Sequence, residues 1–144
     1  MISHLWNDAN GTFFPEGALD FMPVANLREV QLQRLKAVTA LAYERVPLFR
    51  QRMDEKGVKP SDIQTLADVR LLPFSTKSDL RDTYPYGLFA VPMSEVVRLH
   101  ASSGTTGKPI VVGYTEQDME VWKQVIKRSL YAAGFTRGDI VSNM

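Results

Sequence analysis

The sequence predicts an α/β fold, in which a helical first half is followed by a strand, a polar loop, a second strand and a helix. Three observations support this prediction. Apolar side chains recur at helical spacing over residues 27–45. Two short apolar runs, residues 96–100 and 110–114, flank a loop rich in small polar residues. Residues 116–133 show helical spacing again, with one apolar face.

Composition limits the classes of function that the chain can have. Of its 144 residues, 44% are hydrophobic and 23% are charged, which is typical of a globular protein. The net charge of +1 gives no electrostatic basis for binding nucleic acid or an anionic membrane. Cysteine is absent and only two histidines are present, so we predict no metal site built from protein ligands. No secretory signal or membrane-length apolar run is visible, and we expect a cytoplasmic protein.

The first two regions of the chain differ in periodicity. Residues 1–25 are predicted to be an irregular segment, because glycine and proline interrupt any regular pattern. Residues 26–95 follow as a helical region. Its longest helix is predicted over residues 27–45, with Asn26 as the N-cap and Pro47 stopping the run.

Shorter helices are predicted in the rest of this region. One covers residues 48–56 and is closed by Gly57 as a C-cap. A second covers residues 63–69. A third begins with Ser75 or Thr76 as its cap.

Residues 96–144 are predicted to begin an α/β nucleotide-binding subdomain. After the two strands comes the helix over residues 116–133, with Gly134 suited to the C′ position. Residues 140–142 have the composition of a further strand that starts just before the terminus. We therefore expect this chain to be a truncated piece of a longer protein.

The loop between the two strands is suited to holding phosphate. Residues 102–108 contain four hydroxyl side chains, two glycines and one lysine. Glycines allow backbone N–H groups to turn toward an anion, hydroxyls add donors, and lysine adds a positive charge. The pattern is not a Walker A motif, since its spacing is shorter and Pro109 replaces the hydroxyl residue. The predicted phosphate-binding residues are Ser102, Ser103, Gly104, Thr105, Thr106, Gly107 and Lys108.

Residues 102–109 resemble the phosphate loop of the adenylate-forming superfamily, Ser/Thr-Ser-Gly-Thr-Thr-Gly-Lys-Pro, at all eight positions. Residues 73–82 and 84–92, with their Pro-Phe-Ser-Thr-Lys and Tyr-Pro-Tyr-Gly segments, are similar to the stretch before this loop in phenylacetate–coenzyme A ligases. So are residues 98–101, Arg-Leu-His-Ala, which run directly into the loop. The resemblance covers about residues 26–142.

The resemblance implies that the chain is the N-terminal part of the large domain of an adenylate-forming enzyme. Such a ligase joins a carboxylic acid to ATP, giving an acyl-adenylate and pyrophosphate, and coenzyme A then displaces AMP to form the thioester. The implied cofactors are ATP, Mg²⁺ held through the nucleotide phosphates, and coenzyme A as co-substrate. In such enzymes the catalytic residues and most of the acid pocket come later in the chain. We therefore expect them beyond residue 144 and expect these residues to be inactive alone.

Several alternatives remain open at this point. Phenylacetate is the first candidate acid, and a hydroxylated phenylacetate, a benzoate or the substrate of the deazaflavin-cofactor adenylating relatives are others. A stand-alone nucleotide-binding or interaction module, without ligase activity, is the alternative from a different class. The oligomeric state is open, with a homodimer as one candidate.

Three residues near the loop have two interpretations each. His100 could orient a phosphate or the carboxylate, or it could be a satisfied buried histidine. Lys77 and Arg81 could contact the nucleotide or coenzyme A, or they could pair with Asp79 or Asp82 at the surface.

Overall fold

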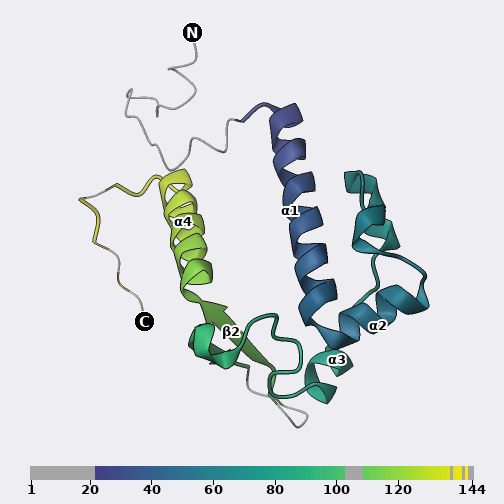
Figure 1. The fold of residues 1–144 in the computed structure, drawn as a ribbon. Helices are drawn as coiled ribbons and strands as arrows, with labels where there is room; N and C mark the ends of the chain where they lie inside the picture. Colours follow the sequence, from purple (N-terminus) through teal and green to yellow (C-terminus); the bar gives the residue numbers. More distant parts are fainter. Residues whose placement is uncertain (1–21, 103–108, 137, 141, 143–144) are drawn as a thin grey trace. The chain divides into compact units, whose positions relative to one another are not determined.

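The computed structural model describes residues 22–102, 109–136, 138–140 and 142 of the chain. The chain divides into two units, one made of residues 25–116 and the other of residues 1–24 together with 117–144. The first unit holds nearly all of the described helices and both strands, and the second holds most of helix α4 (Figure 1).

The first long helix, α1, spans Val24–Arg45. It starts earlier than predicted, so the expectation that Asn26 caps it is wrong: Asn26 lies inside its first turn. Pro23 directly precedes the helix. At the other end the predicted stop is confirmed. Pro47 does not continue α1 but begins the next helix.

Helix α2 spans Pro47–Glu55 and ends as the sequence predicts. Gly57 has a positive φ of 66°, which glycine adopts at little cost. Its N–H donates to the carbonyl of Asp54 at 2.9 Å, and the N–H of Val58 donates to that of Met53 at 2.9 Å. This pair of bonds is the Schellman arrangement, which satisfies the last carbonyls of the helix.

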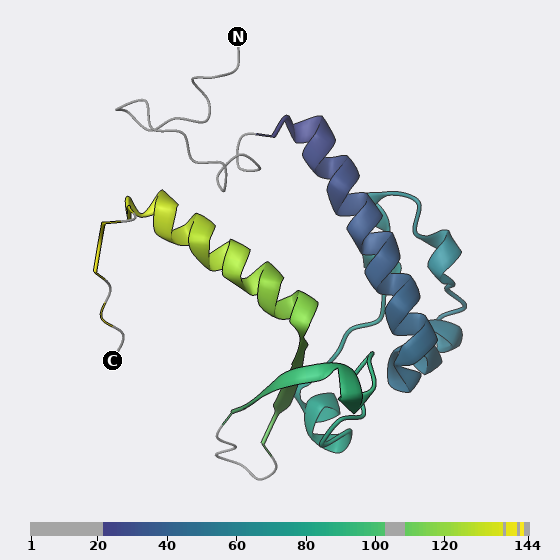
Figure 2. The ribbon, with the colours of Figure 1, turned by 60° about the vertical axis from the view of Figure 1, so that its left-hand side comes forward.

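The predicted helix over residues 63–69 is wrong. Two 3₁₀ turns, η3 (Pro60–Asp62) and η4 (Leu66–Leu71), occupy this stretch. A carboxylate caps each turn: Asp62 accepts from the Lys59 N–H at 2.8 Å, and Asp68 accepts from the Thr65 N–H at 2.7 Å. Such side-chain acceptors compete with a continuous helical ladder. The stretch lies beside α1 in both ribbon views (Figures 1 and 2).

Helix α3 spans Lys77–Asp82, and Thr76 rather than Ser75 is its cap. The Asp79 N–H donates to Thr76 Oγ1 at 3.4 Å, and the Thr76 N–H donates to Asp79 Oδ2 at 2.6 Å. This reciprocal capping box fixes where the helix begins.

The two predicted strands are confirmed. After a short 3₁₀ turn, η5 (Met93–Glu95), strand β1 covers Val96–Ala101 and strand β2 covers Val111–Thr115. They pair antiparallel, and a β-bulge interrupts the register between Val96 and Arg98. Figure 2 shows these strands and the segment that leads into them.

Helix α4 spans Glu116–Ala132 and also ends as predicted. Gly134 has a φ of 89°, and the Phe135 N–H donates to the Leu130 carbonyl at 3.0 Å. Ile140 and Ser142 are not in a strand, while Val141 lies outside the described residues. A strand needs a partner to satisfy its backbone groups, and no described strand pairs with this stretch.

The core of residues 25–116 is small and comes from α1, α2 and the turn between η3 and η4. Its fully buried side chains are Thr39, Met53 and Ile63, with Val46 nearly so. The buried side of α1 is therefore the side that carries Thr39. Leu27, Val38 and Leu41, which are among the apolar residues that recur at helical spacing over residues 27–45, are exposed. Helix α1 thus has apolar residues on two sides, of which the described residues cover one.

Candidate functional site

The hairpin of β1 and β2 brings together the two ends of the predicted phosphate loop. The Ser102 N–H donates to the carbonyl of Ile110 at 3.0 Å, which extends the ladder one step beyond the strands. Ser102 is exposed there. The other predicted phosphate-binding positions, residues 103–108, lie outside the described residues.

The register divides the hairpin into two faces. Opposed residues of an antiparallel pair project to the same side. Leu99 opposes Gly113, and His100 opposes Val112, so these two pairs lie on opposite faces. The rings of His100 and Tyr114 meet edge to face with centroids 5.1 Å apart. This ring contact, together with the half-buried position of His100, favours a structural placement for its side chain.

On the Gly113 face, an aromatic ring occupies the space where a side chain at this position would lie. A Cβ atom placed on Gly113 would lie 2.5 Å from Cε2 and 2.7 Å from Cζ of Phe89. Phe89 also packs against Tyr86, with ring centroids 5.2 Å apart and planes tilted by 51°. The segment before β1 therefore packs directly against the strand that follows the loop.

A salt bridge joins α2 to α3. The Arg52 guanidinium donates to both oxygens of Asp79, at 2.7 and 2.6 Å, and also to the carbonyl of Phe74 at 2.8 Å. Asp79 is 8% exposed. The hydrogen bond from Arg52, and then that from the Thr76 N–H, hold the pKa of the Asp79 carboxyl well below its usual range. The carboxylate oxygens of Asp79 thus accept from Arg52 of α2 and from the Thr76 N–H.

A second polar cluster, made of Tyr43, Asp54 and Lys59, joins α1, α2 and the start of η3. The Tyr43 hydroxyl donates to Asp54 Oδ1 at 2.8 Å, and Lys59 Nζ donates to the Tyr43 hydroxyl at 2.8 Å and to Asp54. The hydrogen bond to Asp54, and then that to Tyr43, raise the pKa of Lys59. The three side chains hydrogen-bond to one another, so the cluster connects these elements.

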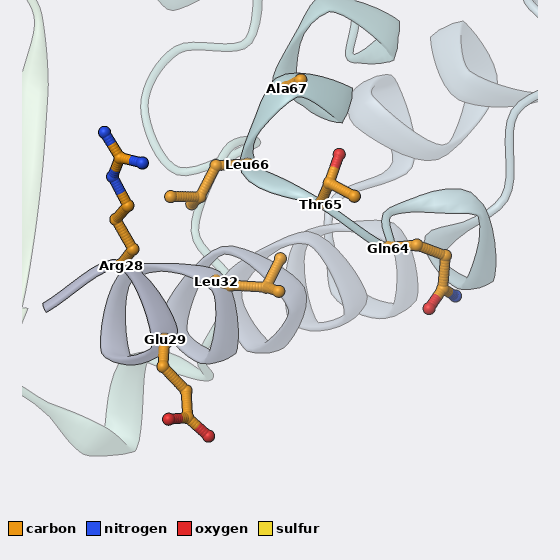
Figure 3. A pocket seen from close by; sticks show the side chains of 7 residues that line it. All are labelled: Arg28, Glu29, Leu32, Gln64, Thr65, Leu66 and Ala67. Carbon is orange, nitrogen blue, oxygen red and sulfur yellow. The ribbon is translucent and has the colours of Figure 1, made fainter. Parts of the chain in front are cut away.

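A shallow hollow of about 620 Å³ lies between α1 and the stretch of residues 64–67 (Figure 3). Glu29 and Leu32 of α1 and Leu66 of the facing stretch are among the residues that line it. Among the described residues, those that line the hollow come from α1 and residues 64–67, and Ser102 is not one of them.

The described residues hold neither a metal-binding cluster nor a membrane-length apolar helix. They contain no group of three or more histidine, cysteine, aspartate and glutamate side chains that could bind a metal ion. Within the same residues, no helix combines the length and apolar character needed to cross a membrane.

Sequence reasoning missed the Arg52–Asp79 bridge and the packing of Phe89 on Gly113. For the Asp79 side of the bridge there was a local signal in the sequence, because Thr76 and Asp79 form a capping-box pattern. No sequence signal pointed to Arg52 as the partner of Asp79, since Arg52 lies on another helix. Phe89 and Gly113 are likewise far apart in the sequence, and no periodic pattern connects them.

Comparison with known proteins adds a second line of information. No family model matches the chain. A phenylacetate–coenzyme A ligase of Pseudomonas putida is 56% identical over 126 residues, which are 85% of this chain. Ligases of the same name from Thermus thermophilus and Escherichia coli are 53% and 55% identical, over 87% and 81% of this chain. The chain belongs to the phenylacetate–coenzyme A ligase family. It spans only 26–29% of the length of these ligases.

Solved structures agree with this family assignment. A 2-hydroxyisobutyryl-CoA ligase, in complex with 2-HIB-AMP and CoA in the thioesterification state, matches with a TM-score of 0.75. It is 32% identical, and the match covers 82% of this chain and 26% of that chain. An open conformation of that ligase, also in complex with 2-HIB-AMP and CoA, matches with a TM-score of 0.73. The prediction of an α/β fold from an adenylate-forming ligase is therefore confirmed.

Proposed function

We propose that this chain carries the phosphate-binding loop of an ATP-dependent acid–thiol ligase. The ligase would activate phenylacetate, or a related aryl acid, as an acyl-adenylate and transfer it to coenzyme A. The observation that carries the proposal is the position of residues 102–109. Their sequence is the adenylate-forming loop pattern, and they connect two antiparallel strands whose ends are joined by the Ser102–Ile110 hydrogen bond.

The chemistry of the reaction explains why such a loop is needed. A carboxylate must approach the strongly anionic triphosphate, and the departing pyrophosphate must be held. The hydroxyls of Ser102, Ser103, Thr105 and Thr106 would donate to β- and γ-phosphate oxygens. Gly104 and Gly107 would allow the backbone to approach closely, and Lys108 would supply a positive charge.

Mg²⁺ fits the same site only indirectly. The donor set of residues 102–108 consists of hydroxyls, backbone amides and an ammonium group, with no carboxylate. Such a set suits phosphate oxygens, whereas Mg²⁺ is usually held by carboxylates together with substrate phosphates. We therefore assign to this chain the phosphates and not the metal, which when bound would neutralise part of their charge. Coenzyme A would be the second substrate, as in the related 2-hydroxyisobutyryl-CoA ligase complexes.

The remaining roles are proposed for parts of the ligase that these 144 residues do not include. Catalytic residues and the acid pocket are assigned beyond residue 144. Within the chain, residues 26–95 would be the helical region and residues 96–144 the start of the nucleotide-binding subdomain. Val24 and Ala25, which the sequence assigned to an irregular segment of residues 1–25, instead begin α1. The ligase would work in the cytoplasm on small molecules, with a homodimer as one candidate assembly.

The first test is the size of the native polypeptide in its source cells, measured with an antibody raised against this chain. We expect a band several times heavier than the 16.2 kDa of these residues. That polypeptide should then catalyse pyrophosphate–ATP exchange that depends on phenylacetate. A native band at 16.2 kDa would instead support the stand-alone binding module.

The second test asks whether the loop binds the nucleotide. In the native polypeptide, Lys108→Ala should lower acid-dependent exchange by about 100-fold, because it removes a charge from the phosphate site. Gly107→Val should act in the same direction by blocking close approach of the backbone. Lys127→Ala is the matched control, since Lys127 is exposed on α4. If both loop variants exchange as fast as this control, the assignment of the loop is wrong.

A further inference from the structure

We propose that Phe89 is a positioning residue for the phosphate-binding loop. Its ring occupies the space beside Gly113 and thereby fixes the strand that leads away from the loop. The inference rests on the function proposed for residues 102–108 and extends it to a residue outside the loop.

The reason for glycine at position 113 is space. Gly113 is not among the described glycines with positive φ, which are Gly57 and Gly134. Any other residue could therefore adopt its backbone conformation. A Cβ atom there would lie 2.5 Å from Cε2 and 2.7 Å from Cζ of Phe89, which is closer than van der Waals contact allows. The absence of a side chain lets the ring lie directly on β2.

The ring of Phe89 is itself held by the segment before it. Its backbone N–H donates to the Tyr86 carbonyl at 3.0 Å, and the two rings pack together. The N–H of Gly87 donates to the Thr83 carbonyl at 2.8 Å. A Cβ atom on Gly87 would lie 2.8 Å from that carbonyl oxygen, so this turn also depends on a close backbone approach.

Hydrogen bonds continue from this turn to the helices. The N–H and hydroxyl of Thr83 donate to the Asp79 carbonyl at 3.1 and 2.6 Å. The carboxylate of Asp79 is bound by Arg52 of α2. A continuous series of contacts therefore runs from α2, through α3 and the turn, to Phe89 and β2.

The position of β2 matters because it sets the exit of the loop. Gly113 opposes Leu99 of β1, and Ile110, just before β2, accepts the hydrogen bond from Ser102. A shift of β2 would change where Ser102 and Ile110 hold the ends of the loop. Catalysis is sensitive to displacements of the bound reacting groups by about 1 Å. Phe89 thus acts on the nucleotide through β2, without touching it.

The test compares Gly113→Ala, Phe89→Leu and the double variant in the native polypeptide. Leucine lacks the Cε2 and Cζ atoms that the new methyl group would meet. We expect Gly113→Ala to raise the KM for ATP in the exchange reaction by about tenfold while leaving the KM for the acid within about twofold. The double variant should return the KM for ATP to within about threefold of the parent, as expected for two residues in contact.

Two variants serve as matched controls. Phe74→Leu makes the same change at an aromatic side chain that is 92% exposed. Gly138→Ala adds a methyl group where the nearest atom to the Cβ is 3.9 Å away. Both should retain the parental KM for ATP. Thermal unfolding of every variant is followed by circular dichroism, so that a loss of folded protein is seen directly.

Lys108→Ala separates this inference from the proposed function. If it abolishes exchange while Gly113→Ala behaves as Gly138→Ala does, the inference alone is overturned. The same holds if the double variant stays as impaired as Gly113→Ala, or if the values of KM for ATP and acid rise together. If Lys108→Ala has no effect, the proposed function fails and the inference fails with it. Selective impairment by Gly113→Ala with rescue in the double variant supports the inference.

Discussion

At the scale of single residues, Asp79 joins helix α2 to both ends of helix α3. Its carboxylate caps its own helix at Thr76 and binds the Arg52 guanidinium, and its carbonyl accepts from Thr83. Charge-assisted bonds of this bidentate kind are among the stronger polar contacts in proteins. Arg52 also donates to the Phe74 carbonyl, and the Phe74 side chain is exposed.

The lowered pKa of Asp79 predicts how stability changes with pH. Because the folded state favours the ionised carboxylate, its contribution is fully present above the unfolded-state pKa, about 4. It is lost as the pH falls toward the lower pKa of the folded state. We expect Asp79→Asn to reduce the free energy of unfolding at pH 7 and to flatten its decline between about pH 5 and pH 2.

Urea unfolding at a series of pH values checks this prediction. Asp82→Asn is the matched control, because Asp82 is exposed on the same helix. It should leave both the stability at pH 7 and the acid decline nearly unchanged. An Asp79→Asn protein with the parental acid decline would show that the Arg52 pair contributes nothing to it.

At the scale of elements, α1 has two apolar sides, and burial distinguishes them. Thr39 is 2% exposed, and its hydroxyl has no hydrogen-bond partner among the described residues. Val38, the adjacent residue, is 57% exposed. A hydroxyl thus lies on the buried side, while an apolar side chain faces outward. Buried polar groups are usually hydrogen-bonded, so a buried hydroxyl without a described partner is unusual.

This arrangement predicts opposite results for two similar substitutions. Thr39→Val should raise the free energy of unfolding by about 1 kcal/mol, because it removes a buried hydroxyl without a partner and keeps the shape of the side chain. Val38→Thr should change it by less than about 0.5 kcal/mol, as is usual for an exposed position. Urea unfolding at pH 7 measures both. A loss of stability in Thr39→Val would mean that its hydroxyl is bonded after all.

Element boundaries were predictable from sequence where a residue acts alone. Gly57 and Gly134 end their helices because only glycine readily takes a positive φ, and Pro47 separates α1 from α2. The helix predicted over residues 63–69 failed because Asp62 and Asp68 bind backbone N–H groups, which a periodicity argument ignores. The side of α1 that would be buried could not be predicted, since apolar residues lie on both.

The candidate site was likewise predictable from the sequence only in part. The pattern of residues 102–109 is contiguous, so it could be recognised from the sequence alone. The contacts that hold the strands and helices around the loop could not be recognised from the sequence. Phe89 meets Gly113, and Arg52 meets Asp79, only after distant segments pack together. Each residue taken singly has a more ordinary explanation, as an aromatic core residue, a turn glycine or a surface charge.

At the scale of the whole molecule, apolar side chains remain exposed on several described elements. Val38 on α1, Val97 on β1 and Val121 on α4 are each more than half exposed. The described sheet has two strands, so each strand has an unpaired edge. Open strand edges and apolar patches commonly mark surfaces that contact other chain segments. The chain also spans less than a third of the length of its ligase relatives.

These surfaces predict that the 144-residue chain, prepared by itself, associates with copies of itself. Sedimentation velocity should show species heavier than a 16.2 kDa monomer, in proportions that rise with concentration. Val97→Lys should shift the distribution toward the monomer, because a lysine at a strand edge disfavours pairing with another strand. Gln117→Lys adds the same charge at an exposed position of α4 and should leave the distribution unchanged. A chain that stays monomeric at every concentration, or responds equally to both lysines, would show that β1 is not the surface through which copies associate.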